Sequence, residues 1–209
     1  VWVVRTAGRM LDADFLRITG NSLVLAGSAA LVTLVVGLFM AYGKRLHGDR
    51  LVRGAVRVAG MGYAIPGTVI AIGVMIPFAW LDNTIDTWMR ARFDFSTGLL
   101  LSGTLAALLF AYMVRFLAVA LQTVEAGLAR IRPSMDEAAR ALGFGPLDVL
   151  KKVHVPMLRG SLITAMLLVF VDVLKELPAT LVLRPFNFNT LAVRTYELAS
   201  DERLADAPA

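Results

Sequence analysis

The 209 residues are 57% hydrophobic and only 18% charged, and the mean hydropathy is +0.69. These values are too apolar for an ordinary soluble domain and indicate an integral membrane protein. The formal charge of +5 therefore fits loops beside a membrane better than a nucleic-acid-binding surface. The chain has no cysteine, which excludes disulfides and thiolate chemistry, and its two histidines are far apart in sequence, so no metal or cofactor site is indicated.

Four segments could cross a bilayer, which requires roughly 20 apolar residues in a helix. They cover residues 23–42, 61–81, 99–121 and about 161–183. Because unpaired backbone groups are not tolerated in lipid, we predict an all-α fold, a polytopic transmembrane helix bundle. Pro66 and Pro77 should bend the second helix. Glycines such as Gly37 and Gly62 predict close packing between helices.

Lysine and arginine are concentrated after the first and third predicted spans. The residues are Lys44, Arg45, Arg50, Arg53 and Arg57 in one loop, and Arg130, Arg132, Arg140, Lys151, Lys152 and Arg159 in the other. Positive loops favour the cytoplasm, so both are expected there. The loop after the second span, which holds Asp82 and Asp86, is then external.

This topology divides the chain into two parts. Residues 1–20 form an extracytoplasmic lead-in, and residues 21–209 form one transmembrane domain with a cytoplasmic loop at 130–158. The sequence begins with Val1, and no apolar helix follows residue 204. We therefore expect a piece of a longer protein that lacks the last membrane helix of the domain.

The cytoplasmic loop carries signals for a short helix. Ser134 and Glu137 have the spacing of a capping box, and Gly143 suits the left-handed position that ends a helix. These signals predict a helix over Met135–Leu142. Its apolar residues share one face: Met135, Ala138, Ala139 and Leu142. So short a helix needs a partner, which could be the protein's own spans or a groove on a soluble subunit.

A second helix should follow in the same loop. Gly145 and Pro146 predict its start, with proline at the first helical position. Val155 and Pro156 are expected to end it before the fourth span. His154, next to that end, is interpreted as a polar surface residue.

The order Glu137-Ala138-Ala139, then Gly143, then Val155-Pro156, resembles the EAA motif in the cytoplasmic loop of ABC-importer permeases. In that family the loop holds a coupling helix that sits in a cleft of a cytoplasmic ATPase dimer. The resemblance implies that five residues couple to the ATPase: Glu137, Ala138, Ala139, Leu142 and Gly143. It also implies the helix bundle of type I importers and a multi-pass protein of the bacterial inner membrane.

Two further stretches, residues 61–73 and 172–203, are similar to the iron(III) subgroup of these permeases. This similarity implies an importer for iron(III) delivered by a periplasmic ferric-binding protein. No G-x-x-x-x-G-K-[ST] sequence occurs, so ATP hydrolysis would belong to a separate chain and this chain would not be an enzyme.

A cluster of charges interrupts the fourth predicted span. Asp172, Lys175 and Glu176 lie within about one turn, and Pro178 should break the helix after them. Ionisable groups inside a membrane often mark a pathway or gate, so these four residues are candidates for one. The alternative is a cluster at the outer end of the span, where Lys175 reaches the interface and pairs with a carboxylate.

Residues 187–190 predict another helix start, and residues 191–204 mix apolar and charged side chains. We expect an amphipathic helix at the outer surface. It could lie on lipid or face an extracytoplasmic binding protein.

Other functions remain open from the sequence. Related permeases carry thiamine, polyamines or other small solutes. An ion-coupled secondary transporter would explain the charges at residues 172–176 but would leave the cytoplasmic helix without a role. An intramembrane enzyme ranks last, because neither H-E-x-x-H nor G-x-S-x-G occurs.

Overall fold

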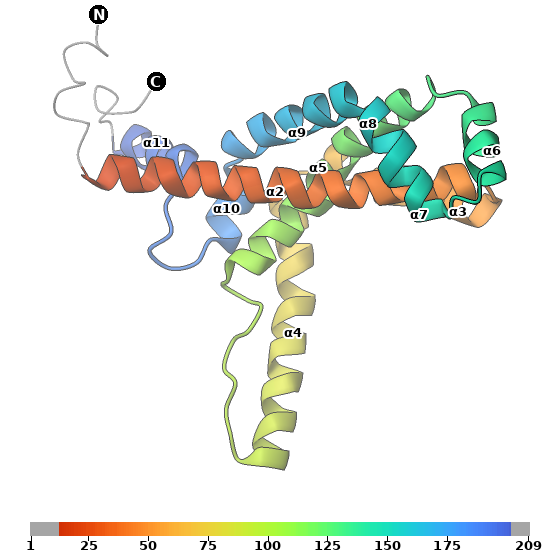
Figure 1. Ribbon diagram of the computed structural model, residues 1–209. Coiled ribbons are helices and arrows are strands. Elements are labelled where there is room, and N and C mark those ends of the chain that lie inside the picture. The colour runs from red at the N-terminus through yellow and green to blue at the C-terminus, as the bar shows by residue number, and fades with distance from the viewer. Residues whose placement is uncertain (1–12, 202–209) are drawn as a thin grey trace, which may run out of the picture. The chain divides into compact units, whose positions relative to one another are not determined.

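The computed structural model describes residues 13–201, and in that range the chain forms helices and no strand (Figure 1). The predicted lead-in up to residue 12 and the end of the predicted outer helix, residues 202–204, lie outside the described residues. The elements are α2 (Ala13–Leu46), α3 (Arg50–Ala59), the 3₁₀ turn η1 (Gly62–Ala64), α4 (Gly67–Phe93), α5 (Leu105–Leu128), α6 (Pro133–Ala141), α7 (Pro146–Val149), the π-helical η2 (Leu150–His154), α8 (Val155–Met157), α9 (Arg159–Leu174), α10 (Pro178–Leu183) and α11 (Leu191–Ser200). The all-α prediction is confirmed.

Within residues 13–201, three helices are long and apolar enough to cross a membrane: α2, α4 and α5. They correspond to the first three predicted spans. The fourth predicted span is divided, because α9 ends at Leu174 and α10 begins at Pro178. The break at Pro178 is confirmed, and proline occupies the first position of the new helix, where its missing N–H costs nothing.

The second and third spans begin later than predicted. Pro66 precedes the first residue of α4, because its fixed backbone angles suit an entry into a helix. Helix α4 then runs through Pro77 to Phe93. Helix α5 begins at Leu105, after a loop at residues 94–104.

The described residues form two compact units, each assembled from separate stretches of the chain. The first unit holds residues 13–29, 65–112 and 171–201, and the second holds residues 30–64 and 113–170. Helices α2, α5 and α9 each supply residues to both units.

In the first unit, two carboxylates of α4 hold the loop that leads to α5. Asp82 is only 1% exposed, and it accepts hydrogen bonds of 2.7 to 3.2 Å from the backbone amides of residues 100–102. One turn later, Asp86 accepts from the amides of residues 97–98 and from the hydroxyl of Ser96. Both were predicted to be loop residues. They lie in α4 because that helix extends further than its apolar run.

The start of α2 and the start of α11 are joined within the same unit. Ser22 Oγ accepts a 2.8 Å hydrogen bond from the backbone amide of Leu191, and the Asn21 side chain donates to the carbonyl of Asn189. Thr190 caps α11 by accepting from the amide of Val193. The predicted helix start at residues 187–190 is confirmed.

The core of the second unit is centred on the last turns of α5. Val124 is fully buried, and Leu121 and Leu128 are each 4% exposed. Other buried members of this core come from α2, α3, the bend before α9, and α9: Ala41, Val56, Leu158 and Ala165. Alanine occupies the α2 and α9 positions, and leucine, isoleucine and valine fill the rest of this core.

Two glycines in this unit permit close backbone contact. A Cβ atom at Gly37 would lie 3.2 Å from the Cβ atom of Ala120, and one at Gly62 would lie 2.0 Å from the carbonyl oxygen of Val114. No side chain fits at Gly62 unless the backbone of α5 moves. The prediction of close packing is confirmed at these two positions.

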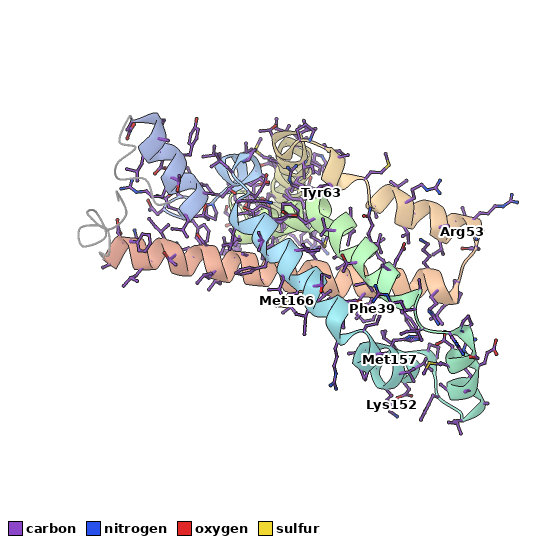
Figure 2. All side chains as sticks on the ribbon, turned by 90° about the horizontal axis from the view of Figure 1, so that it is seen from above. Phe39, Arg53, Tyr63, Lys152, Met157 and Met166 are labelled. Atoms are coloured by element: carbon purple, nitrogen blue, oxygen red, sulfur yellow. The ribbon has the colours of Figure 1, made fainter. Side chains whose placement is uncertain are left out.

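Large apolar side chains also project away from the second unit (Figure 2). Phe39 of α2 is 53% exposed, and Met166 of α9 is 38% exposed. Exposing such side chains to water costs free energy, whereas contact with the hydrocarbon of a bilayer does not. Both helices therefore have the surface of a membrane-spanning element.

Candidate functional site

Helix α6 begins one residue before the predicted cap. Arg132 is the N-cap, Pro133 is the first helical residue, and no side chain caps the amides of the first turn. The capping box of Ser134 and Glu137 is therefore wrong. Proline is preorganised for the first helical position and takes it, which places Ser134 inside the helix.

The end of α6 follows the prediction. Gly143 has a φ of +83°, and its amide donates a 2.9 Å hydrogen bond to the carbonyl of Arg140. The amide of Phe144 donates to the carbonyl of Ala139. A left-handed residue in this place closes the last turn, and glycine adopts it without strain.

The predicted apolar face of α6 is divided between two environments. Ala139 is 5% exposed and packs within the second unit together with Asp136. Met135 is 38% exposed, Leu142 is 76% exposed, and Ala138 is also exposed. One side of the helix thus folds against the protein's own chain, whereas three apolar residues remain open.

The remaining predicted coupling residues, Glu137 and Gly143, are exposed. Nearby apolar side chains are open as well, with Leu147 59% exposed and Met157 51% exposed. The ammonium of Lys152 lies 4.6 Å from the centre of the Phe144 ring, a cation–π contact. The loop therefore presents a mixed apolar and basic surface.

A buried polar cluster fixes α6 to the end of α2. Arg45 donates through Nε to Asp136 Oδ2 at 2.8 Å. Its two terminal nitrogens donate to the carbonyl oxygens of Leu128 and Ile131, at 2.6 and 2.9 Å. Leu128 is the last residue of α5, and its carbonyl also accepts a 3.1 Å hydrogen bond from the amide of Ile131, which lies in the loop that follows. One guanidinium thus joins α2, α5 and α6.

The other oxygen of Asp136 faces the second half of the loop. Asp136 Oδ1 lies 2.9 Å from His154 Nε2, and the His154 side chain is fully buried. The ring centroids of Tyr42 and His154 are 5.2 Å apart, and the Tyr42 hydroxyl donates a 2.7 Å hydrogen bond to the carbonyl of Pro146. The interpretation of His154 as a surface residue is wrong.

Burial lowers the pKa of His154 below its ordinary value of 6.5, and the nearby Arg45 lowers it further, although the Asp136 carboxylate acts in the opposite direction. The folded loop therefore favours neutral His154. Because the pKa is depressed, this contribution to stability is present above about pH 6.5 and is lost as the pH falls through the pKa of the folded state.

The prediction that the second helix of the loop ends at Val155–Pro156 is wrong. This helix continues through η2 and α8 to Met157, and the chain then turns by 79° into α9. The wider π-helical turn of η2 precedes Pro156 and accommodates a residue that cannot donate to the helix. Leu158, 2% exposed, fills the core at the bend. The predicted start at Gly145–Pro146 is confirmed.

The second group of predicted site residues lies in the first unit, around the break between α9 and α10. Lys175 Nζ is 2.7 Å from Asp172 Oδ1, and the Lys175 side chain is 70% exposed. Glu176, 7% exposed, accepts from the backbone amide of Ala179 in the first turn of α10, which begins at Pro178. The pairing of Lys175 with a carboxylate is thus present.

A hydrogen-bonded chain continues from this break. Thr180 Oγ1 donates to the carbonyl of Glu176 at 2.6 Å, and the hydroxyls of Tyr112 and Thr180 are 2.5 Å apart. Among residues 13–201, no three His, Asp or Glu side chains gather closely enough to hold a metal ion.

Sequence reasoning missed the cluster of Arg45, Asp136 and His154. Arg45 and Asp136 are 91 residues apart. No local sequence pattern predicts their contact, and from the sequence Arg45 is only one of the positive residues of the first loop. The only available signal was a histidine and an aspartate next to the motif that suggested the coupling loop.

Comparison with known proteins places residues 33–196 in the family described as "Binding-protein-dependent transport system inner membrane component". The Fe(3+)-transport system permease protein FbpB 2 of Haemophilus influenzae is 25% identical over 195 residues, which cover 93% of this chain and 35% of that protein. PhnV of Salmonella typhimurium, named for 2-aminoethylphosphonate transport, is 27% identical over 188 residues, or 90% of this chain and 65% of that protein. The chain thus spans between about a third and two thirds of the length of these relatives.

Replacement of Arg45 by methionine should loosen the loop. It leaves the Asp136 carboxylate, 11% exposed, without its main counter-charge, at a cost of about 3 kcal/mol or more. We expect lower thermal stability in detergent and faster hydrogen exchange over residues 128–142. Lys44→Met is the matched control, since it breaks a pair with Glu125 in which both side chains are about one-third exposed, worth under about 1 kcal/mol. Equal effects of the two variants would contradict the role of Arg45.

Proposed function

Since this chain belongs to the family of binding-protein-dependent transport system inner membrane components, we propose that it forms part of the membrane permease of an ATP-driven ABC importer. The observation that carries the proposal is the loop at 130–158. Its α6 is anchored by Asp136 and Ala139 and leaves Glu137, Ala138 and Leu142 open. A short helix held on one side and apolar on the other suits a groove on a second subunit.

In this mechanism the chain performs no chemical step. A separate cytoplasmic ATPase dimer hydrolyses ATP, and its cleft receives α6 as the coupling helix. Glu137, Ala138, Leu142 and Gly143 meet the ATPase. Ala139 acts differently, since its small buried side chain lets the helix pack closely on its own protein.

The Arg45 cluster gives the coupling helix a mechanical connection. When α6 moves, Asp136 moves with it. Arg45 is hydrogen-bonded to Asp136 and to the carbonyls at the end of α5, so α2 and α5 are displaced as well. Breaking such a buried charge pair is costly, so the three segments move together rather than separately. Both α2 and α5 are long enough to span the membrane.

The substrate we propose is iron(III), delivered by a periplasmic ferric-binding protein. Relatives named for ferric transport support it, including FbpB 2 of Haemophilus influenzae. A second candidate is an organophosphonate, because PhnV is about as similar and the chain covers more of its length. In either case α11 lies on the extracytoplasmic side, where a binding protein docks.

Uptake by reconstituted vesicles tests both parts of the proposal. The complete permease is combined with its ATPase and an iron-loaded ferric-binding protein, with or without ATP. We expect uptake of iron only with ATP. Uptake driven by a proton or sodium gradient without ATP would contradict an ABC importer. ATP-dependent uptake of 2-aminoethylphosphonate from its own binding protein, without iron uptake, would contradict the ferric assignment alone.

Gly143 should be needed for coupling. Valine at a φ of +83° is strained by roughly 1–2 kcal/mol or more, so Gly143→Val distorts the end of α6. We expect weaker ATPase association and slower uptake. Gly143→Asn is the control, because asparagine tolerates the left-handed region. No added Cβ would meet another atom within 4 Å, so crowding does not explain a difference. Normal association and uptake by the valine variant would refute this role.

We also propose that the break at residues 172–180 lines the translocation path or its outer gate, with Asp172, Lys175, Glu176 and Pro178 as its residues. Glu176→Gln separates charge from structure, because glutamine keeps an oxygen that can accept from Ala179. We expect the variant to fold and uptake to fall about tenfold. An ionisable group inside a membrane span is costly, and such groups usually have a function in transport. Unchanged uptake at equal membrane abundance would exclude the role of the charge.

A further inference from the structure

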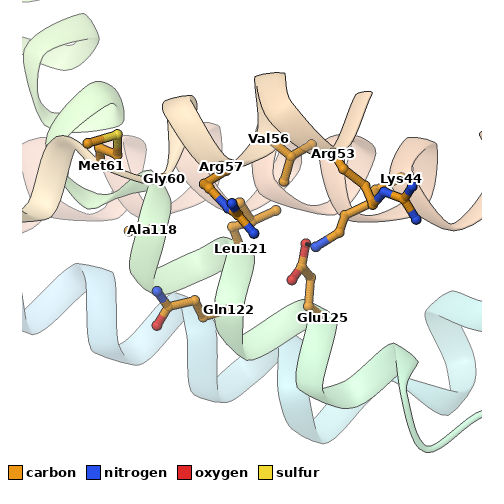
Figure 3. A pocket seen from close by; sticks show the side chains of 10 residues that line it. All are labelled: Lys44, Arg53, Val56, Arg57, Gly60, Met61, Ala118, Leu121, Gln122 and Glu125. Atoms are coloured by element: carbon orange, nitrogen blue, oxygen red, sulfur yellow. Dashed lines mark hydrogen bonds and ion pairs between the residues drawn. The ribbon is translucent and has the colours of Figure 1, made fainter. Parts of the chain in front are cut away.

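The second unit contains a pocket of about 380 Å³ beside α3 and α5 (Figure 3). Its volume is at the lower end of the range for small-molecule sites. Charged groups line its rim: Lys44 from α2, Arg53 and Arg57 from α3, and Glu125 from α5. Val56 and Leu121, both nearly fully buried, form its apolar floor.

The rim has an excess of positive charge. Lys44 Nζ lies 2.7 Å from Glu125 Oε1, so these two charges compensate each other. Arg53 and Arg57 are exposed and lie four residues apart, on one face of α3. Within residues 13–201, neither guanidinium makes a hydrogen bond or ion pair. The pocket thus offers two uncompensated cations above an apolar floor, which is the chemistry that receives an anionic amphiphile.

Helix α3 also carries an apolar strip that no other part of residues 13–201 covers. Leu51 is 83% exposed and Val58 is 68% exposed, and their spacing of seven positions places both on the same side of the helix. Arg53 and Arg57 lie on a different side of α3 from this strip, and separate apolar and basic sides are typical of helices that lie in a membrane interface. Exposure of Leu51 and Val58 to water is unfavourable, whereas at the surface of a bilayer these side chains can enter the acyl region.

The location agrees with this interpretation. Helix α3 directly follows the membrane-spanning α2, in a segment that also carries Lys44, Arg45 and Arg50. Positive loops of this kind are cytoplasmic, and the cytoplasmic leaflet carries the anionic lipids that attract basic segments.

We propose that this pocket binds an anionic phospholipid of the cytoplasmic leaflet. The lipid phosphate lies between Arg53 and Arg57, and the first part of an acyl chain covers Val56 and Leu121. A soluble phosphate compound would use the arginines but would leave the apolar floor of Val56 and Leu121 uncovered, so a lipid is the better occupant.

Lipid binding by the complete permease tests the proposal. The purified protein is titrated with phosphatidylglycerol or with zwitterionic phosphatidylethanolamine, and bound lipid is counted by native mass spectrometry. We expect one phosphatidylglycerol to bind with clear preference. Arg53→Gln combined with Arg57→Gln should weaken it about 30-fold, because each basic group near an anionic lipid contributes roughly a fivefold factor. Both side chains are exposed, so the variant should fold.

Arg50→Gln is the matched control, since Arg50 lies on the same helix but does not line the pocket. We expect a smaller loss than for the double variant. An equal loss would mean a general charge effect and would overturn the site. Competition by glycerol phosphate at lipid-like concentrations would show a soluble-anion site, and equal affinity for both lipids would also contradict the proposal.

Discussion

The guanidinium of Arg45 holds together parts of the chain that are distant in sequence. It donates to one carboxylate and two carbonyl oxygens, on α6 and at the end of α5, while its own backbone belongs to α2. A buried charge is stable only if its hydrogen-bonding groups are satisfied, so this geometry permits little variation. His154 and Tyr42 extend the same constraint to the second half of the loop. The exposed residues of α6 owe their position to this cluster.

Features that depend on residues close together in sequence, such as helix spans, breaks and ends, were mostly predicted correctly. Apolar runs predicted three spanning helices, Pro178 predicted the break in the fourth, and Gly143 predicted the end of α6. The capping box failed because Pro133 competes for the same turn. Val155–Pro156 failed as a helix end because a π-helical turn accommodates the proline. His154 and Asp82 could not be foreseen as buried, since their partners lie on other elements. Long-range polar contacts leave no periodic trace in a sequence.

Charge has a different task in each part of the molecule. Asp82 and Asp86 order a loop through backbone amides, and Glu176 receives the first turn of α10. Arg45 and Asp136 connect helices, whereas Arg53 and Arg57 face outward beside apolar residues. The coupling role of the loop at 130–158 is our proposal, and the contacts of Arg45 explain how that loop is held against α2 and α5.

The proposed coupling role of the loop requires that the open side of α6 meets the ATPase. The sequence has no cysteine, so Leu142→Cys provides a single label, and its side chain is 76% exposed. Maleimide labelling should be fast in the permease alone and slow in the complex with the ATPase. Phe186→Cys is the control, because Phe186 is fully exposed. It should be labelled equally fast in the permease alone and in the complex with the ATPase. Equal labelling of position 142 with and without a bound ATPase would contradict the coupling role of the loop.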